Sequence, residues 1–107
     1  MATNEASDAW DALADGTRRA IVAALAEGPQ AVGQLAEGLP VTRSAVSQHL
    51  KVLKGAGLVS ERAEGTRRIY RLNPMAVAAL RDQLDTYWQR ALSGYAQVVE
   101  RAEEDEA

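Results

Sequence analysis

Residues 42–59 decide the fold of this chain and read TRSAVSQHLKVLKGAGLV. When residues are placed at about 100° intervals around a helix, Val46, Leu50 and Leu53 fall on one side. The polar residues that fall within a narrow arc opposite them are Ser44, Ser47, Gln48 and Lys51. The apolar side can therefore pack on a small core while the polar side faces a ligand.

The polar arc holds only short or planar hydrogen-bonding groups and one terminal cation. A glutamine can form two hydrogen bonds with adenine, a serine can reach several bases, and a lysine can lie against a phosphate. We therefore predict that this helix reads DNA. The alternative is an ordinary surface helix whose polar side faces water, because any isolated amphipathic segment can be one. The flanking sequence has to distinguish the two interpretations. His49 lies beside the apolar side, which favours packing or a phosphate contact over base reading.

The charge of the chain is unevenly distributed. The formal net charge is −3 over 107 residues, yet residues 41–74 carry seven basic and two acidic side chains, a net charge of +5. The flanking ranges 1–40 and 75–107 each carry a net charge of −4. Positive charge is thus concentrated around the predicted reading helix, as phosphate binding requires.

Length and composition indicate a single small domain. The chain has no cysteine, which excludes disulfides and thiolate metal sites. We expect a cytoplasmic protein, because the acidic start does not resemble a secretory signal and no apolar run reaches the length of a membrane span. With a single histidine and no phosphate-binding glycine loop, we expect neither an enzyme nor a cofactor.

Short helices are predicted before the reading helix. Ser7 and Asp15 can cap helices over 8–14 and 16–26, and a third helix is predicted over 32–37. Thr42 caps the reading helix, and Gly57 followed by an apolar residue is typical of a left-handed helix end. The short spacing between the third and fourth helices predicts a helix-turn-helix.

A β-hairpin is predicted after the reading helix. Residues 59–62 and 67–72 can pair around Gly65, with Arg67 and Arg68 next to the turn. Such a basic hairpin is typical of a wing that contacts the DNA backbone or the minor groove. Protection of a sheet edge by charge is the alternative interpretation.

The last helix is predicted to begin at Pro74, capped by Asn73, and to run to about Arg101. Residues 1–7 are expected to be disordered, residues 8–101 to form the domain, and residues 102–107 to form a frayed acidic tail. The helix carries a long apolar stripe that a small domain cannot cover, so we predict a homodimer; folding back as monomer core is the alternative. The expected interface residues are Trp10, Leu13, Leu80, Leu84, Tyr87, Trp88, Leu92 and Tyr95.

Several blocks in order resemble the ArsR-type winged helix-turn-helix repressors. They are LADGTRR (13–19), VGQLA (32–36), SAVSQHLKVL (44–53), GLV (57–59) and GTRRIYRL (65–72). The resemblance extends from Trp10 to Tyr95, and the last helix is similar to the subgroup without thiols, which includes autoregulatory repressors of actinobacteria. It implies a mainly α fold of five helices with a small β-hairpin, dimerising through the first and last helices.

The same resemblance implies that two reading helices enter successive major grooves of an inverted repeat and repress transcription, often of the protein's own gene. Many relatives release DNA when a metal binds. Here the positions of their thiolate pair hold Ala31 and Gly33, and the last helix has no histidine for their second site. We therefore expect no response to metals through the family's usual sites.

Our main hypothesis is a sequence-specific, dimeric repressor that binds double-stranded DNA. The residues expected to contact DNA are Thr42, Arg43, Ser44, Ser47, Gln48, His49, Lys51, Arg67 and Arg68. The alternative is a protein-interaction module that uses the winged-helix scaffold without specific DNA binding.

Overall fold

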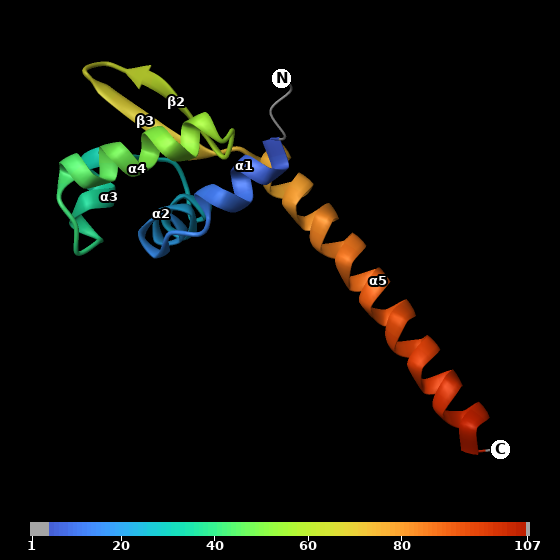
Figure 1. Ribbon diagram of the computed structural model, residues 1–107. Coiled ribbons are helices and arrows are strands. Elements are labelled where there is room, and N and C mark those ends of the chain that lie inside the picture. Colours follow the sequence, from blue (N-terminus) through green and yellow to red (C-terminus); the bar gives the residue numbers. More distant parts are fainter. Residues whose placement is uncertain (1–4, 107) are drawn as a thin grey trace.

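A computed structural model describes residues 5–106. Within them the chain forms five helices and three strands. In order they are α1 (Glu5–Ala12), α2 (Gly16–Ala26), β1 (Gln30–Ala31), α3 (Val32–Glu37), α4 (Arg43–Gly55), β2 (Val59–Glu64), β3 (Arg67–Leu72) and α5 (Pro74–Glu106). The predicted winged helix-turn-helix with five helices is confirmed. Figure 1 shows helices α1 to α4 gathered beside the β2–β3 wing, while α5 extends away from them.

The core forms around the apolar side of α4, as predicted. Val46, Leu50 and Leu53 are fully buried. The other buried members of this core are Ala9, Ala12, Ile21, Leu25, Leu35, Leu58, Val59 and Leu80. Because α4 buries one side among the other helices, its opposite side is left free for a ligand.

Both ends of α4 follow the local signals in the sequence. The Thr42 hydroxyl accepts a hydrogen bond from the backbone N–H of Ala45 at 3.1 Å. At the other end, Gly57 adopts a φ of +80°, and the Leu58 N–H donates to the Leu53 carbonyl at 3.0 Å. This left-handed end turns the chain directly into β2.

The sheet contains one strand that the sequence analysis missed. Its order is β1-β3-β2, with Gln30 paired to Tyr70 and Ala31 to Ile69. All neighbouring strands are antiparallel. A strand of only two residues has no alternating pattern to detect, and it exists because β3 offers it a free edge.

The bounds of the first helix differ from the prediction. Helix α1 begins at Glu5 rather than at residue 8, so residues 5–7, which were expected to be disordered, belong to the helix, and Ser7 lies within it rather than before its start. Residues 1–4 of the predicted disordered segment lie outside the described residues. The helix ends at Ala12 rather than at residue 14, because the Arg18 Nε donates to the Ala12 carbonyl at 2.6 Å and stabilises an earlier turn.

The last helix is longer than predicted. Helix α5 continues to Glu106 instead of ending near Arg101, so most of the expected acidic tail is helical; residue 107 lies outside the described residues. Alanine and glutamate have high helix propensity, and no glycine or proline follows Arg101 to stop the helix.

Candidate nucleic-acid interface

The polar side of α4 is open to solvent. Ser44, Ser47, Gln48 and Lys51 are all exposed, while the opposite side of the same helix is buried. The helix begins with a capped N-terminus whose free N–H groups favour an anion such as a phosphate. This face therefore combines hydrogen-bonding side chains with the positive end of a helix dipole.

Three arginines from separate parts of the chain line one hollow. Arg43 comes from the start of α4, while Arg67 and Arg68 come from the start of β3, and all three line a hollow of about 340 Å³ beside α3. The Arg43 guanidinium lies over Gly33, where an added Cβ would come within 2.7 Å of its Nη2 atom. Glycine at position 33 thus leaves room for the Arg43 guanidinium at the edge of α4.

One carboxylate lies between two cations on this basic surface. The Glu61 Oε1 atom is 2.6 Å from the Lys54 Nζ and 3.1 Å from the Arg68 Nη1. The hydrogen bond from Lys54, with further contributions from Tyr70 and Arg68, lowers the pKa of Glu61 from 4.5 to about 2. Burial, followed by the same carboxylate, raises the pKa of Tyr70. Glu61 is therefore ionised at neutral pH.

This contact distinguishes the two wing arginines. Arg68 is engaged by Glu61, whereas no carboxylate within residues 5–106 lies within 4.0 Å of an Arg67 nitrogen. Among the described residues, Arg67 is therefore the wing arginine without such an ion pair, and its contact with DNA stays a prediction. The sequence analysis missed the contact between Lys54 and Glu61. The available signal for it in the sequence was an acidic residue among basic ones.

His49 lies against the start of α2 rather than at the centre of the exposed arc. Its Nδ1 atom is 3.4 Å from the Arg18 Nη1 and 3.9 Å from the Asp15 Oδ2, and the side chain is half-buried. The Asp15 carboxylate also accepts a hydrogen bond from the Arg18 N–H at 2.9 Å, which lowers the pKa of Asp15. His49 thus connects α4 to the cap of α2, and a phosphate contact by His49 stays a prediction.

The predicted interface residues on α5 fall into two groups. Leu80 is 7% exposed and belongs to the core, where it packs beneath α1. In the single chain Leu80 is thus covered already, and its place in a dimer interface stays a prediction. The other members of the stripe are 44% to 70% exposed: Leu84, Tyr87, Trp88, Leu92 and Tyr95.

The first helix covers only the beginning of α5. The Trp10 indole Nε1 donates a hydrogen bond to the Gln83 Oε1, and Trp10 and Leu13 are partly buried against the core. All described residues of α5 after Gln83 are exposed. Figure 1 shows this later part of α5 extending away from the other elements. An apolar stripe on a projecting helix is typical of a surface that another helix covers.

The potential metal ligands are dispersed among the described residues. Within residues 5–106, the histidine and the carboxylates form no group of three that could share an ion. None of the helices in this range is both long and apolar enough to cross a membrane.

Comparison with known proteins identifies the family. The model of the arsR family of bacterial regulatory proteins matches residues 15–61. HTH-type transcriptional regulator Rv2034 of Mycobacterium tuberculosis is 61% identical over 106 residues, an alignment that covers 98% of this chain and 99% of that protein. These relatives are regulators of transcription, in agreement with the expectation that the chain is not an enzyme.

Solved structures give the same result. A crystal structure of a possible transcriptional regulator for arsenical resistance is 43% identical, with a TM-score of 0.70 over 80% of this chain and 94% of that chain. The homodimeric winged helix-turn-helix DNA-binding domain of Mb0332 from Mycobacterium bovis is 34% identical, with a TM-score of 0.67 over 83% and 82% of the two chains. The chain therefore belongs to the ArsR family and is a transcriptional regulator with a winged helix-turn-helix DNA-binding domain.

Proposed function

We propose that this regulator is a cytoplasmic homodimeric repressor that binds an inverted repeat, including one in the promoter of its own gene. The observation that carries the proposal is the division of the exposed surface. The polar face of α4 and the wing arginines occupy one end of the chain, and the apolar stripe of α5 occupies the other. One end can therefore bind DNA while the other pairs with a second copy.

Each DNA-facing residue has a role that follows from its chemistry. Ser44, Ser47 and Gln48 read base edges in the major groove, because their side chains are short or planar hydrogen-bonding groups. The positions expected to hold the DNA backbone are Thr42, Arg43, His49, Lys51, Arg67 and Arg68. Among the two wing arginines, Arg67 makes the stronger phosphate contact because Glu61 already engages Arg68.

The α5 stripe supports the dimer. Leu84, Tyr87 and Trp88 are more than half exposed in one chain, so covering them with a second copy removes a large apolar area from water. Trp10 and Leu13 border the same end of α5. A two-fold dimer of this kind presents two α4 helices to half-sites about one turn of DNA apart, or about 10 base pairs. Occupying the promoter then blocks transcription.

Binding to the DNA upstream of the gene tests this function. The wild-type chain is expected to bind this duplex more tightly than a shuffled duplex of the same composition, and a footprint is expected to show two protected half-sites. Gln48→Ala should cost about 1–3 kcal/mol per half-site on the specific duplex and little on the shuffled one. Gln97→Ala is the control, because it removes an exposed glutamine from α5.

The same fragment can report repression directly. Transcription from it in vitro should fall when wild-type protein is added and should persist with Gln48→Ala. Equal losses on both duplexes for Gln48→Ala would rule out base reading by this residue. Unchanged transcription at saturating wild-type protein would rule out repression while leaving DNA binding intact.

A further inference from the structure

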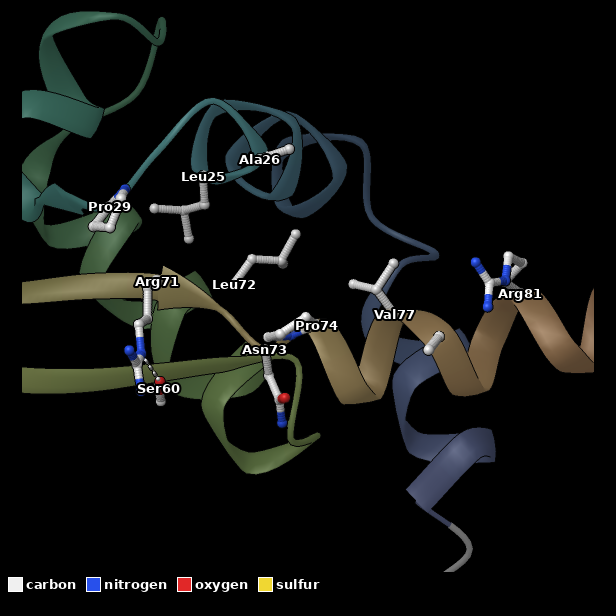
Figure 2. A pocket seen from close by; sticks show the side chains of 11 residues that line it. Leu25, Ala26, Pro29, Ser60, Arg71, Leu72, Asn73, Pro74, Val77 and Arg81 are labelled. Carbon is white, nitrogen blue, oxygen red and sulfur yellow. Dashed lines mark hydrogen bonds between the residues drawn. The ribbon is translucent and has the colours of Figure 1, made fainter.

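A cavity lies at the junction between the winged domain and α5. Its volume is about 780 Å³, within the range of about 300–1,000 Å³ that is usual for small-molecule sites. Figure 2 shows walls from three directions: the end of α2, the start of β2 with the end of β3, and the first turns of α5. None of the residues proposed to contact DNA lines this cavity.

The middle of the cavity is apolar and its two ends are cationic. Leu25, Leu72 and Val77 line it from three different elements (Figure 2). Leu25 is 3% exposed, so Leu72 and Val77 provide most of the apolar surface that a ligand can reach. Arg71 lies at one end of this apolar patch and Arg81 at the other. No carboxylate is among the described residues that line the cavity. The walls therefore match a molecule with an apolar body and a negative charge.

The two arginines differ in how firmly they are held. The Arg71 Nε donates to the Ser60 Oγ at 3.2 Å, which orients the guanidinium and leaves its Nη atoms for another acceptor. The nearest recorded carboxylate partner of Arg81 is Asp82, at 4.0 Å, and both side chains are 73% exposed, so this pair is weak. Arg71 is thus the better prepared of the two to hold an anion.

We propose that this cavity binds a small amphipathic anion. The apolar body of the ligand lies on Leu72 and Val77, and its acidic group is held by Arg71, with Arg81 adding positive charge at the opposite end. Val77 is 38% exposed in the unliganded chain, so the ligand covers apolar surface that water otherwise contacts.

The position of the cavity allows a bound ligand to affect the direction of α5 relative to the winged domain. Its walls lie on both sides of Asn73 and Pro74, where the winged domain joins α5. A bound ligand therefore holds α5 in one direction relative to the reading helix. If α5 joins two copies, which rests on the function proposed above, the ligand changes the separation of the two α4 helices and hence the affinity for the inverted repeat.

Fluorescence titration with 8-anilinonaphthalene-1-sulfonate tests the site without DNA. This probe is an apolar anion, and N-phenyl-1-naphthylamine is the matching neutral compound. The wild-type chain is expected to bind one sulfonate probe per chain in a saturable manner and to bind the neutral compound more weakly. Arg71→Gln should weaken sulfonate binding by about tenfold and leave the neutral compound unaffected. Arg81→Gln should have a smaller effect in the same direction.

One variant locates the bound probe. Arg90→Gln makes the same charge change on α5 outside the cavity and should leave sulfonate binding unchanged. A loss with Arg90→Gln equal to that with Arg71→Gln would overturn the proposal. So would the absence of saturable binding, including the case in which a second copy covers the cavity.

A second measurement tests the coupling to DNA. DNA affinity is measured by anisotropy with and without the sulfonate probe, and the probe is expected to change it in the wild type but not in Arg71→Gln. Saturable probe binding without DNA binding would support the ligand site and contradict the proposed function. DNA binding without saturable probe binding would support the proposed function and contradict the ligand site. The experiment therefore distinguishes failure of one proposal from failure of the other.

Discussion

Lys54 at the end of α4 and Glu61 on β2 form an ion pair in which the Lys54 Nζ and the Glu61 Oε1 are 2.6 Å apart. The same carboxylate oxygen also meets Arg68 of β3 at 3.1 Å, so one acid joins the reading helix to both strands of the wing. Its side chain is only 16% exposed, while both cations are largely exposed. Glu61 therefore partly neutralises two positive charges and at the same time joins the wing to α4.

Replacing Glu61 should strengthen non-specific DNA binding. Glu61→Gln removes one negative charge from the DNA-facing surface and frees Lys54 and Arg68 for phosphates. We expect tighter binding to a shuffled duplex and a salt dependence that steepens by roughly one unit per additional phosphate contact. Anisotropy titrations at several salt concentrations measure both effects. Glu64→Gln is the matched control: it makes the same charge change on β2, but its partner is Arg62, at 3.5 Å. Equal gains in the two variants would contradict a special role for Glu61.

Acid should remove the stability that Glu61 provides. Its pKa is lowered from 4.5 to about 2 in the folded chain, so folding favours the ionised form. That contribution is complete above the ordinary value of 4.5 and is lost as the pH falls toward 2. The difference in urea midpoint between wild type and Glu61→Gln should therefore shrink from pH 6 to pH 3. A difference that stays constant or grows over this range would show that the carboxylate charge contributes nothing.

The two wing arginines should not be equivalent. Arg67→Ala is expected to weaken specific and shuffled duplexes alike and to reduce the salt slope by about one, because it removes a free phosphate-binding cation. Arg68→Ala should have a smaller effect on DNA binding, because Glu61 partly neutralises that charge. Parallel titrations of both variants decide this. A larger loss with Arg68→Ala would mean that the ion pair opens when DNA binds.

Charge placed on the α5 stripe should separate the proposed dimer. Leu84→Asp is expected to shift sedimentation from a dimer to a monomer, since Leu84 is 53% exposed in the single chain and has no part in its core. Circular dichroism should show that helical content at equal concentration is largely retained. Asp85→Asn, which alters the next residue on α5, serves as the control and should remain dimeric. A dimer that withstands Leu84→Asp would place the interface elsewhere.

Two glycines near the end of α4 should respond to alanine in opposite ways. Gly57 has a φ of +80°, so Gly57→Ala should destabilise the chain by about 1–2 kcal/mol. Gly55 is the last residue of the helix, and an added Cβ there meets nothing within 4 Å. Gly55→Ala should therefore stabilise the chain by about 0.5–1 kcal/mol. Urea denaturation compares the two, and a shift of the same sign in both would refute the assignment of Gly57 to the left-handed turn.

The features that could be predicted are those that depend on neighbouring residues. Thr42 and Gly57 mark the ends of α4 through local backbone chemistry, and the spacing of Val46 and Leu50 identifies its buried side. The regular spacing along α5 did not reveal that α1 covers Leu80, because that depends on how two distant helices pack.

The candidate site also combines features that the sequence could predict with features that it could not. The exposed side of α4 follows from helical geometry, whereas the role of Glu61 requires Lys54 from α4 and Arg68 from β3 to meet it. The two-residue strand β1 likewise depends on Tyr70 and Ile69 of β3. Such contacts between distant parts of one chain leave no periodic pattern in the sequence.

Helix α5 follows β3 with only Asn73 between them, and it runs for 33 residues. At 1.5 Å per residue the helix is about 50 Å long, so a change of a few degrees in its direction at Asn73 moves its far end by several times the displacement at its first turn. If α5 joins two copies, as proposed above, substitutions near Asn73 should alter the preferred half-site spacing without changing any residue proposed to contact DNA.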